Sequence, residues 1–186
     1  CSAYKFYGPH VSFLYSKPGL LGSLTTDRLV VQDQEAPYII ETGTLNHAAC
    51  SGVASAIDFI SSIGKGSSLR EKLESAYKQI SIHEFELAKH LYDSLQKEDK
   101  ITVIGQDFSS KKRTPTVSFV HNDFSPQDVC KKLASKNICA WDGHFYALKA
   151  IQKLGLEQAG GVTRLGVSLY NTKQEIDRVV EVIKNL

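Results

Sequence analysis

The second half of the sequence contains two helix-start signals, each lying among short β-type runs. In Ser125-Pro126-Gln127-Asp128 and Thr172-Lys173-Gln174-Glu175, a hydroxyl residue is followed three positions later by a carboxylate, which is the pattern of a capping box. The first signal also has proline at the first helical position. After the second, apolar residues recur at the spacing of one helix face: Ile176, Val179, Val180 and Ile183. Strand patterns that alternate with such helices predict an α/β chain with a small mixed or antiparallel sheet.

The remaining patterns predict the other elements and a domain boundary. A helix is expected after Asn46, because apolar residues follow at spacings of four, four and three: Ala49, Val53, Ile57 and Ile60. Glycines and serines at 64–68 end it and separate two domains, residues 1–68 and 69–186. Other strands are expected at 10–15, 101–104, 116–121, 138–141 and 162–169, and other helices at about 69–95, 126–136 and 144–154.

Composition excludes several classes of protein. The 186 residues are 42% apolar and 23% charged, with a formal net charge of +2, so no nucleic-acid partner is expected. The basic cluster Lys111-Lys112-Arg113 is interpreted as a solvated loop. No apolar run approaches the roughly 18 residues of a membrane span. The cysteines lack metal-ligand spacing and are expected to be reduced in a cytoplasmic protein, with Cys139 buried in the core.

The chain contains no methionine and begins with Cys1. We therefore expect it to be part of a longer protein.

Lys5 is the first candidate for chemistry. It lies among Tyr4, Phe6 and Tyr7 and before the turn at Gly8-Pro9. Desolvation by such neighbours favours the neutral amine, which is a nucleophile toward a carbonyl such as that of pyridoxal phosphate. The alternative is a lysine whose methylenes pack on the rings while its ammonium reaches water, which is the commoner case for an isolated lysine of this kind.

Two other stretches suggest sites for anions. In Glu41-Thr42-Gly43-Thr44-Leu45-Asn46, Thr44 and the N–H groups of a helix start suit a phosphate, although N-capping by Thr44 or Asn46 is the alternative. Strand alternation places Arg164 opposite the apolar face, where its guanidinium can bind a carboxylate through two hydrogen bonds. A surface ion pair is the alternative for Arg164.

A third stretch, Trp141-Asp142-Gly143-His144-Phe145-Tyr146, ends a predicted strand in a tight turn. It presents the only tryptophan together with His144 and Tyr146. His144 could transfer a proton or orient a substrate, and helix capping or packing is equally open.

In their order along the chain these stretches resemble the motifs of one family. SAYKFYGPH resembles the lysine motif of the class V aminotransferase family of pyridoxal-phosphate enzymes, in its cysteine-desulfurase-like branch. ETGTLN resembles its E-x-G-T loop, and RLGVSLYNTKQEID its C-terminal signature. WDGHFYA is similar to the loop that reads Gly-His-His-Cys-Ala in desulfurases. The resemblance implies fold type I, with residues 1–68 as the end of a large domain and 69–186 as a complete small α+β domain.

The resemblance also implies roles for these residues. Lys5 would form the Schiff base with pyridoxal 5'-phosphate and move the substrate α-proton. Ser2 would contact the cofactor phosphate of its own subunit, and Gly43 and Thr44 that of the partner, in a homodimer with shared active sites. Arg164 would hold the carboxylate of an amino-acid substrate.

Other positions depart from the family pattern. Tyr4 replaces the histidine usual before the lysine, beside the cofactor. Trp141 replaces an arginine common near the substrate, and His144 with Tyr146 completes the expected substrate-binding set. Tyr146 stands where desulfurases carry the cysteine that accepts sulfur, and a phenol cannot carry a persulfide.

The expected function is therefore that of an aminotransferase- or lyase-type enzyme rather than a true desulfurase, with the isolated 186 residues inactive. The alternative is a non-catalytic homologue that keeps the fold for binding or assembly. The joint presence of Lys5, Thr44 and Arg164 argues against that alternative.

Overall fold

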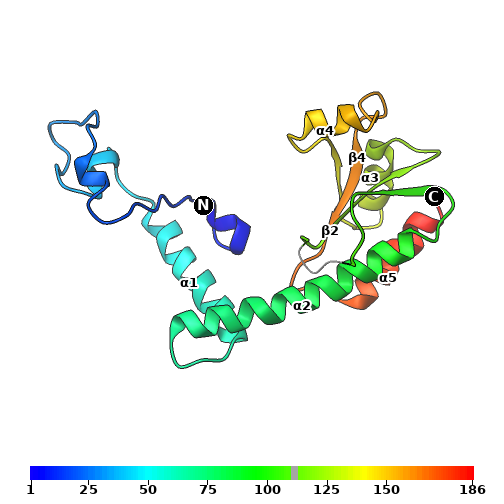
Figure 1. The fold of residues 1–186 in the computed structure, drawn as a ribbon, viewed down its shortest axis with the longest axis horizontal. Helices are drawn as coiled ribbons and strands as arrows, with labels where there is room; N and C mark the ends of the chain where they lie inside the picture. The colour runs from blue at the N-terminus through cyan, green and yellow to red at the C-terminus, as the bar shows by residue number, and fades with distance from the viewer. Residues whose placement is uncertain (110–112) are drawn as a thin grey trace. The chain divides into compact units, whose positions relative to one another are not determined.

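The computed structural model describes residues 1–109 and 113–186, and the chain divides into two compact units, Cys1–Tyr77 and Lys78–Leu186 (Figure 1). Lys111 and Lys112 of the basic cluster lie outside the described residues. The expected boundary after residue 68 coincides with the start of helix α2 (Leu69–Leu95), whereas the two units divide within that helix.

The first unit contains helix α1 (His47–Ile63) and three short 3₁₀ helices, η1 (Ala3–Phe6), η2 (Leu21–Ser23) and η3 (Tyr38–Ile40). The predicted helix is confirmed. Its buried side chains are Ala49, Val53, Ala56 and Ile60. Ala56 takes the place expected for Ile57, which is only half-buried, because spacings of four, three and four residues follow a single helix face.

The predicted strand at residues 10–15 is wrong. In its place is an isolated bridge between Ser2 and Ser12, in which the Ala3 N–H donates to the Val11 carbonyl at 2.8 Å. A strand needs a neighbouring strand along its length to pair its N–H and C=O groups. The contact with residues 1–3 is confined to this short bridge, and the Val11 N–H donates instead to the Pro9 carbonyl at 2.8 Å. The β-type pattern therefore does not produce a sheet.

The first turns of α2 pack closely against the end of α1. A Cβ placed on Gly64 would lie 1.9 Å from the Lys72 carbonyl oxygen, so only glycine allows this approach. These turns therefore belong to the first unit. The later turns contribute Ala88, Leu91 and Leu95 to the core of the second unit.

The second unit contains a four-stranded sheet with the order β1-β2-β4-β3. Its strands are β1 (Ile101–Ile104), β2 (Thr116–His121), β3 (Trp141–Gly143) and β4 (Val162–Gly166). Every neighbouring pair is antiparallel, which confirms one of the two expected sheet types. The core contains side chains from α2, β2, α3 (Pro126–Ala134), β4 and α5 (Lys173–Lys184).

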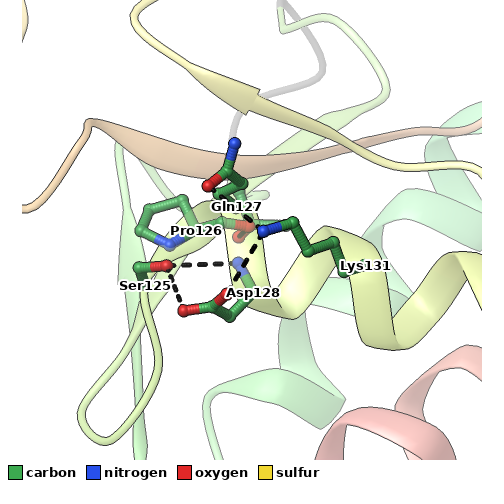
Figure 2. Close-up of polar contacts among 6 residues, drawn as sticks. Ser125, Pro126, Gln127, Asp128 and Lys131 are labelled. Carbon is green, nitrogen blue, oxygen red and sulfur yellow. Dashed lines mark hydrogen bonds and ion pairs between the residues drawn. The ribbon is translucent and has the colours of Figure 1, made fainter.

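Both predicted helix starts are confirmed, and the reciprocal capping box forms at Thr172, whereas at Ser125 the hydroxyl alone caps the helix. The Ser125 hydroxyl accepts from the Asp128 N–H at 3.1 Å and donates to the Asp128 carboxylate at 2.6 Å (Figure 2). At α5, the Thr172 hydroxyl accepts from the Glu175 N–H at 3.3 Å, and the Glu175 carboxylate accepts from the Thr172 N–H at 2.8 Å. Each cap pairs N–H groups that the helix itself leaves unbonded.

Two elements begin later than predicted. Asn137 is left-handed (φ 56°) and the Ile138 N–H returns to the Leu133 carbonyl at 3.0 Å, so the chain joins the sheet only at Trp141. Cys139 is consequently exposed, and the expectation of a buried core thiol is wrong. Helix α4 (Leu148–Lys153) starts after a turn that contains two left-handed residues, a conformation that no helix continues through.

Strand β4 ends before the predicted residue 169. The strand ends at Gly166, although the Val167 N–H still donates to the Pro115 carbonyl at 2.9 Å, and the Ser168 N–H donates to the Asn171 side-chain oxygen at 2.9 Å. That bond starts the turn which leads to α5.

Arg113 has a structural role in the part of the basic cluster that is described. Its guanidinium carbon lies 3.9 Å from the centroid of the Phe108 ring, and it donates to the Thr116 carbonyl at 2.7 Å. The expectation of a merely solvated loop is therefore wrong for Arg113. None of the helices in the described residues is long and apolar enough to cross a membrane.

Candidate functional site

Lys5 lies in η1, within a closed loop formed by residues 1–13. The Lys5 N–H donates to the Ser2 carbonyl at 3.1 Å, and the Gly8 N–H donates to the Ala3 carbonyl at 2.9 Å. Ala3 is completely buried, and a Cβ on Gly8 would come within 2.9 Å of the Ala3 Cβ. These contacts fix the backbone around Lys5.

The side chain of Lys5 is exposed in this chain. The neighbouring rings pair with other rings instead of enclosing the amine: Tyr4 stacks on His10 with centroids 5.3 Å apart, and Phe6 stacks on Phe13 at 6.1 Å. The expectation that its sequence neighbours desolvate Lys5 is therefore wrong. His10 was not predicted to contact Tyr4, because nothing in the spacing of the two residues indicates a stack.

The loop before α1 leaves Gly43 and Thr44 exposed. Asn46 is the N-cap of α1, and its side chain accepts from the Ala49 N–H at 3.0 Å. The capping alternative is thus correct for Asn46 and wrong for Thr44. Asn46 already accepts from one of the N–H groups at the helix start. Binding of an anion at this loop would therefore rely mainly on Thr44 and the preceding backbone N–H groups, and less on the helix start than the sequence predicts.

The turn that carries Lys5 also carries Ser2, whose side chain is half-buried. A primary amine can bind an aldehyde covalently, and a hydroxyl can donate a hydrogen bond to a phosphate oxygen. An aldehyde and a phosphate are the two groups of pyridoxal phosphate that such residues would hold. The residues of this loop therefore fit that cofactor chemically.

Arg164 lies on β4, between β2 and β3. Its neighbours Thr163 and Leu165 are buried, Thr163 with 0% of its surface exposed, whereas Arg164 is half-buried on the opposite face. It is paired in register with Ser118 and Trp141, so these three side chains share one face of the sheet. The alternation predicted for Arg164 is confirmed.

The guanidinium of Arg164 lies over the ring of Phe145, with its central carbon 4.0 Å from the ring centroid. Within residues 1–109 and 113–186, Arg164 forms no ion pair with an aspartate or glutamate. The alternative of a surface ion pair is therefore wrong within the described chain. The sequence reasoning missed Phe145, since only its place between His144 and Tyr146 connects it with the site.

The turn after β3 has an unusual backbone. Phe145 (φ 50°) and Tyr146 (φ 63°) are consecutive left-handed residues, and the Ala147 N–H donates to the His144 carbonyl at 2.7 Å. Such residues cost on the order of 1–3 kcal/mol each and are found mainly where surrounding contacts impose them. Ala147, not His144, precedes the first residue of α4, so the helix-capping alternative for His144 is wrong.

The predicted substrate-binding residues all lie in the second unit. Trp141 is 67% exposed, Tyr146 is fully exposed, and His144 is exposed as well. Trp141 and Arg164 are brought together by strand pairing. His144 and Tyr146 lie on the turn that follows the same strand.

Cys130 on α3 is a thiol of low reactivity near this turn. Burial, followed by the negative charge of Asp142 and a hydrogen bond to it, raises the pKa of Cys130 to about 11. The thiolate is the reactive form of cysteine, so we expect Cys130 to be a poor nucleophile at neutral pH.

Comparison with known proteins gives a match along nearly the whole chain. The family model of aminotransferase class-V matches residues 1–179. The chain belongs to the class V aminotransferase family. Among class V relatives, it is 28% identical over 169 residues to a probable cysteine desulfurase of Methanothermobacter thermautotrophicus, covering 90% of this chain and 38% of that protein. It is also 28% identical over 184 residues to the aminotransferase-like protein FGM3 of Gibberella zeae, covering 96% of this chain and 43% of that protein.

The fold of this class V chain is also that of a solved structure. The crystal structure of the cysteine desulfurase CsdA from Escherichia coli matches with a TM-score of 0.76 and 22% identity, over 99% of this chain and 44% of that one. This confirms the expected fold. The chain spans less than half the length of these relatives.

Proposed function

We propose that the protein carrying this chain is a pyridoxal-phosphate-dependent enzyme of aminotransferase or lyase type that acts on an amino acid. The observation that carries this proposal is that Arg164, half-buried on the sheet face opposite Thr163 and Leu165, has no carboxylate partner in the described residues. Membership of the class V aminotransferase family supports it.

Lys5 is proposed to bind the cofactor aldehyde covalently and to remove and return the proton at the substrate Cα. Backbone hydrogen bonds hold the main chain of Lys5 in η1, so its side chain extends from a defined position. The cofactor, when bound, supplies an electron sink that stabilises negative charge at Cα. Ser2 would donate a hydrogen bond to the cofactor phosphate from the same turn.

Gly43 and Thr44 are proposed to contact the cofactor phosphate of a second subunit. Their support is exposure: the Thr44 hydroxyl is not used as a helix cap, and an added Cβ on Gly43 would meet no atom within 4 Å. The protein would accordingly be a homodimer. In the same proposal, residues 1–68 belong to the large domain and residues 69–186 form the small one.

Arg164 is proposed to bind the substrate carboxylate through two parallel N–H···O bonds. Trp141 lies beside it on the adjacent strand and is proposed to contact the rest of the substrate. Tyr146 is proposed to line the same region. Because a phenol cannot form a persulfide, release of sulfur through an enzyme-bound persulfide at this position is not part of the proposal.

The test uses the whole protein, purified with added pyridoxal phosphate and then reduced with borohydride. We expect the mass of the cofactor on the peptide that contains Lys5, and none in Lys5→Ala. Lys17→Ala, which removes another exposed lysine of the same unit, is the matched control and should keep the label on Lys5.

An amino-acid screen then identifies the reaction from keto acids, ammonia, sulfide or inverted stereochemistry. Absence of cofactor from Lys5 would contradict the enzyme proposal and favour a non-catalytic binding or assembly protein. Sulfide release from cysteine that persists in Tyr146→Phe would support desulfuration by another residue and contradict the role assigned to this turn.

A further inference from the structure

Phe145 is the one side chain of its turn that folds back onto the sheet. Its neighbours His144 and Tyr146 are exposed, whereas Phe145 is half-buried with its ring 4.0 Å from the guanidinium carbon of Arg164. Phe145 and Tyr146 therefore have different environments. Phe145 contacts Arg164, and Tyr146 faces solvent.

The backbone of the turn produces this arrangement. Gly143 ends β3 with a φ of 115°, and Phe145 and Tyr146 follow in left-handed conformation. Successive left-handed residues reverse the chain within a few positions. Because the chain reverses here and does not continue away from the sheet, Phe145 lies back over β4.

A ring stacked on a guanidinium restricts it without using its hydrogen-bond donors. All five N–H groups of arginine lie in the plane of the guanidinium, and the Phe145 ring attracts the guanidinium through its charge and offers no carboxylate or carbonyl acceptor. The edge that binds a carboxylate stays available. Restricting the side chain before binding also lowers the conformational entropy that binding would otherwise cost.

We propose that Phe145 is a positioning residue whose ring holds the Arg164 guanidinium in the orientation that binds a substrate carboxylate. The inference rests on the proposed role of Arg164. Phe145 itself does not touch the carboxylate. Any residue without a ring at this position would leave Arg164 free to adopt other rotamers.

The experiment measures carboxylate binding at Arg164 in the whole, cofactor-loaded protein, with acetate as the probe. Phenylglyoxal modifies arginine, and mass spectrometry reports the rate for the peptide that contains Arg164, with and without acetate at constant ionic strength. We expect acetate to slow modification in the wild type and in Phe145→Tyr. In Phe145→Leu, protection should require about fivefold more acetate, the size expected for losing one cation–π contact.

Phe124 offers a matched control on the same unit. Its ring lies 4.4 Å from the ammonium of Lys132, so Phe124→Leu removes a comparable contact away from Arg164. Phe124→Leu should leave acetate protection unchanged. Phe145→Met is a second ring-free variant, and circular dichroism confirms that each variant is folded.

Steady-state kinetics with the amino acid found in the screen separate positioning from general damage. Removing binding energy common to the substrate and the transition state raises KM and leaves kcat unchanged. We expect this result for Phe145→Leu. Arg164→Lys should raise KM further.

Each outcome has a distinct meaning. If acetate does not protect Arg164 in the wild type, the carboxylate role is wrong and the inference is wrong with it. If protection is equal in the wild type and Phe145→Leu, Arg164 keeps its proposed role and only the inference is wrong. If both ring-free variants fail to fold while Phe145→Tyr folds, the ring serves the fold instead, which also overturns the inference.

Discussion

The backbone of Gly161 lies so close to that of Gly143 that a Cβ on Gly161 would be 2.3 Å from the Gly143 carbonyl oxygen. Gly143 is the last residue of β3 and pairs with Val162, the first residue of β4. This contact brings the two strands together at the end from which the Phe145 turn emerges. It therefore helps to place Trp141 and Arg164 side by side.

Two adjacent glycines allow the importance of this contact to be measured. Gly160 and Gly161 both have positive φ, 85° and 94°, but an added Cβ on Gly160 would meet nothing within 4 Å. Gly160→Ala should lower the free energy of unfolding by about 1–2 kcal/mol through backbone strain alone. Gly161→Ala should lower it further, because the Gly143 backbone must also move.

Urea unfolding of the two variants provides the comparison. The excess loss in Gly161→Ala should be at least about 1 kcal/mol, in the range found when a well-packed region must shift. If the free energy of unfolding falls equally in the two variants, the added Cβ on Gly161 is accommodated beside Gly143 without further loss of stability.

The α5 cap predicts a dependence of stability on pH. The Thr172 N–H, followed by the Asn171 amide, holds the pKa of Glu175 below its ordinary value in the folded protein. A lowered pKa in the folded state means that the stabilisation is complete above the unfolded pKa and is lost as pH falls through the folded pKa. Wild type should therefore lose stability more steeply than Glu175→Gln below about pH 5.

Denaturant unfolding between pH 7 and pH 3 measures this effect. Glu181→Gln is the matched control, since Glu181 is an exposed glutamate further along the same helix. It should keep the wild-type slope. If Glu175→Gln and the wild type lose stability in parallel, the carboxylate of Glu175 does not contribute in the way that its hydrogen bonds indicate.

Cys130 should be the slowest of the described thiols to react with iodoacetamide. With its pKa raised to about 11 by burial and by Asp142, roughly 0.1% of Cys130 is thiolate at pH 8. Cys50 and Cys139 are exposed and should be alkylated first. Mass spectrometry of time points gives the rate for each cysteine in the native protein.

Asp142→Asn tests the second cause of this shift. Removing the negative charge should lower the pKa of Cys130 and speed its alkylation, while Cys139 reacts at an unchanged rate. If Cys130 in the wild type reacts as fast as Cys139, the conclusion that burial raises the pKa of the Cys130 thiol is wrong.

Local sequence was sufficient for several features of this chain. The caps at Ser125 and Thr172 form between residues three positions apart, so the pattern that predicts them contains all of their partners. The same holds for the buried face of α5 and for the orientation of Arg164, which follow from helix and strand periods. The motif order also led to the correct family.

Features that depend on distant partners were not available from the sequence. Residues 10–15 have the composition of a strand, but strand formation requires a neighbouring strand along the whole segment. Cys139 is exposed because Asn137 turns the chain before it reaches the sheet. Burial and pairing are properties of the folded chain, and no local pattern contains them.

The candidate site shows the same contrast between local and distant features. The motifs predict Lys5, Thr44 and Arg164 as candidates, because the chemistry of each is a property of the residue type and its immediate neighbours. They do not predict Phe145, because its contact with Arg164 joins two elements separated in sequence and needs a left-handed turn at two non-glycine residues. Neither residue prefers that conformation by itself, so only the packing of the turn onto β4 selects it.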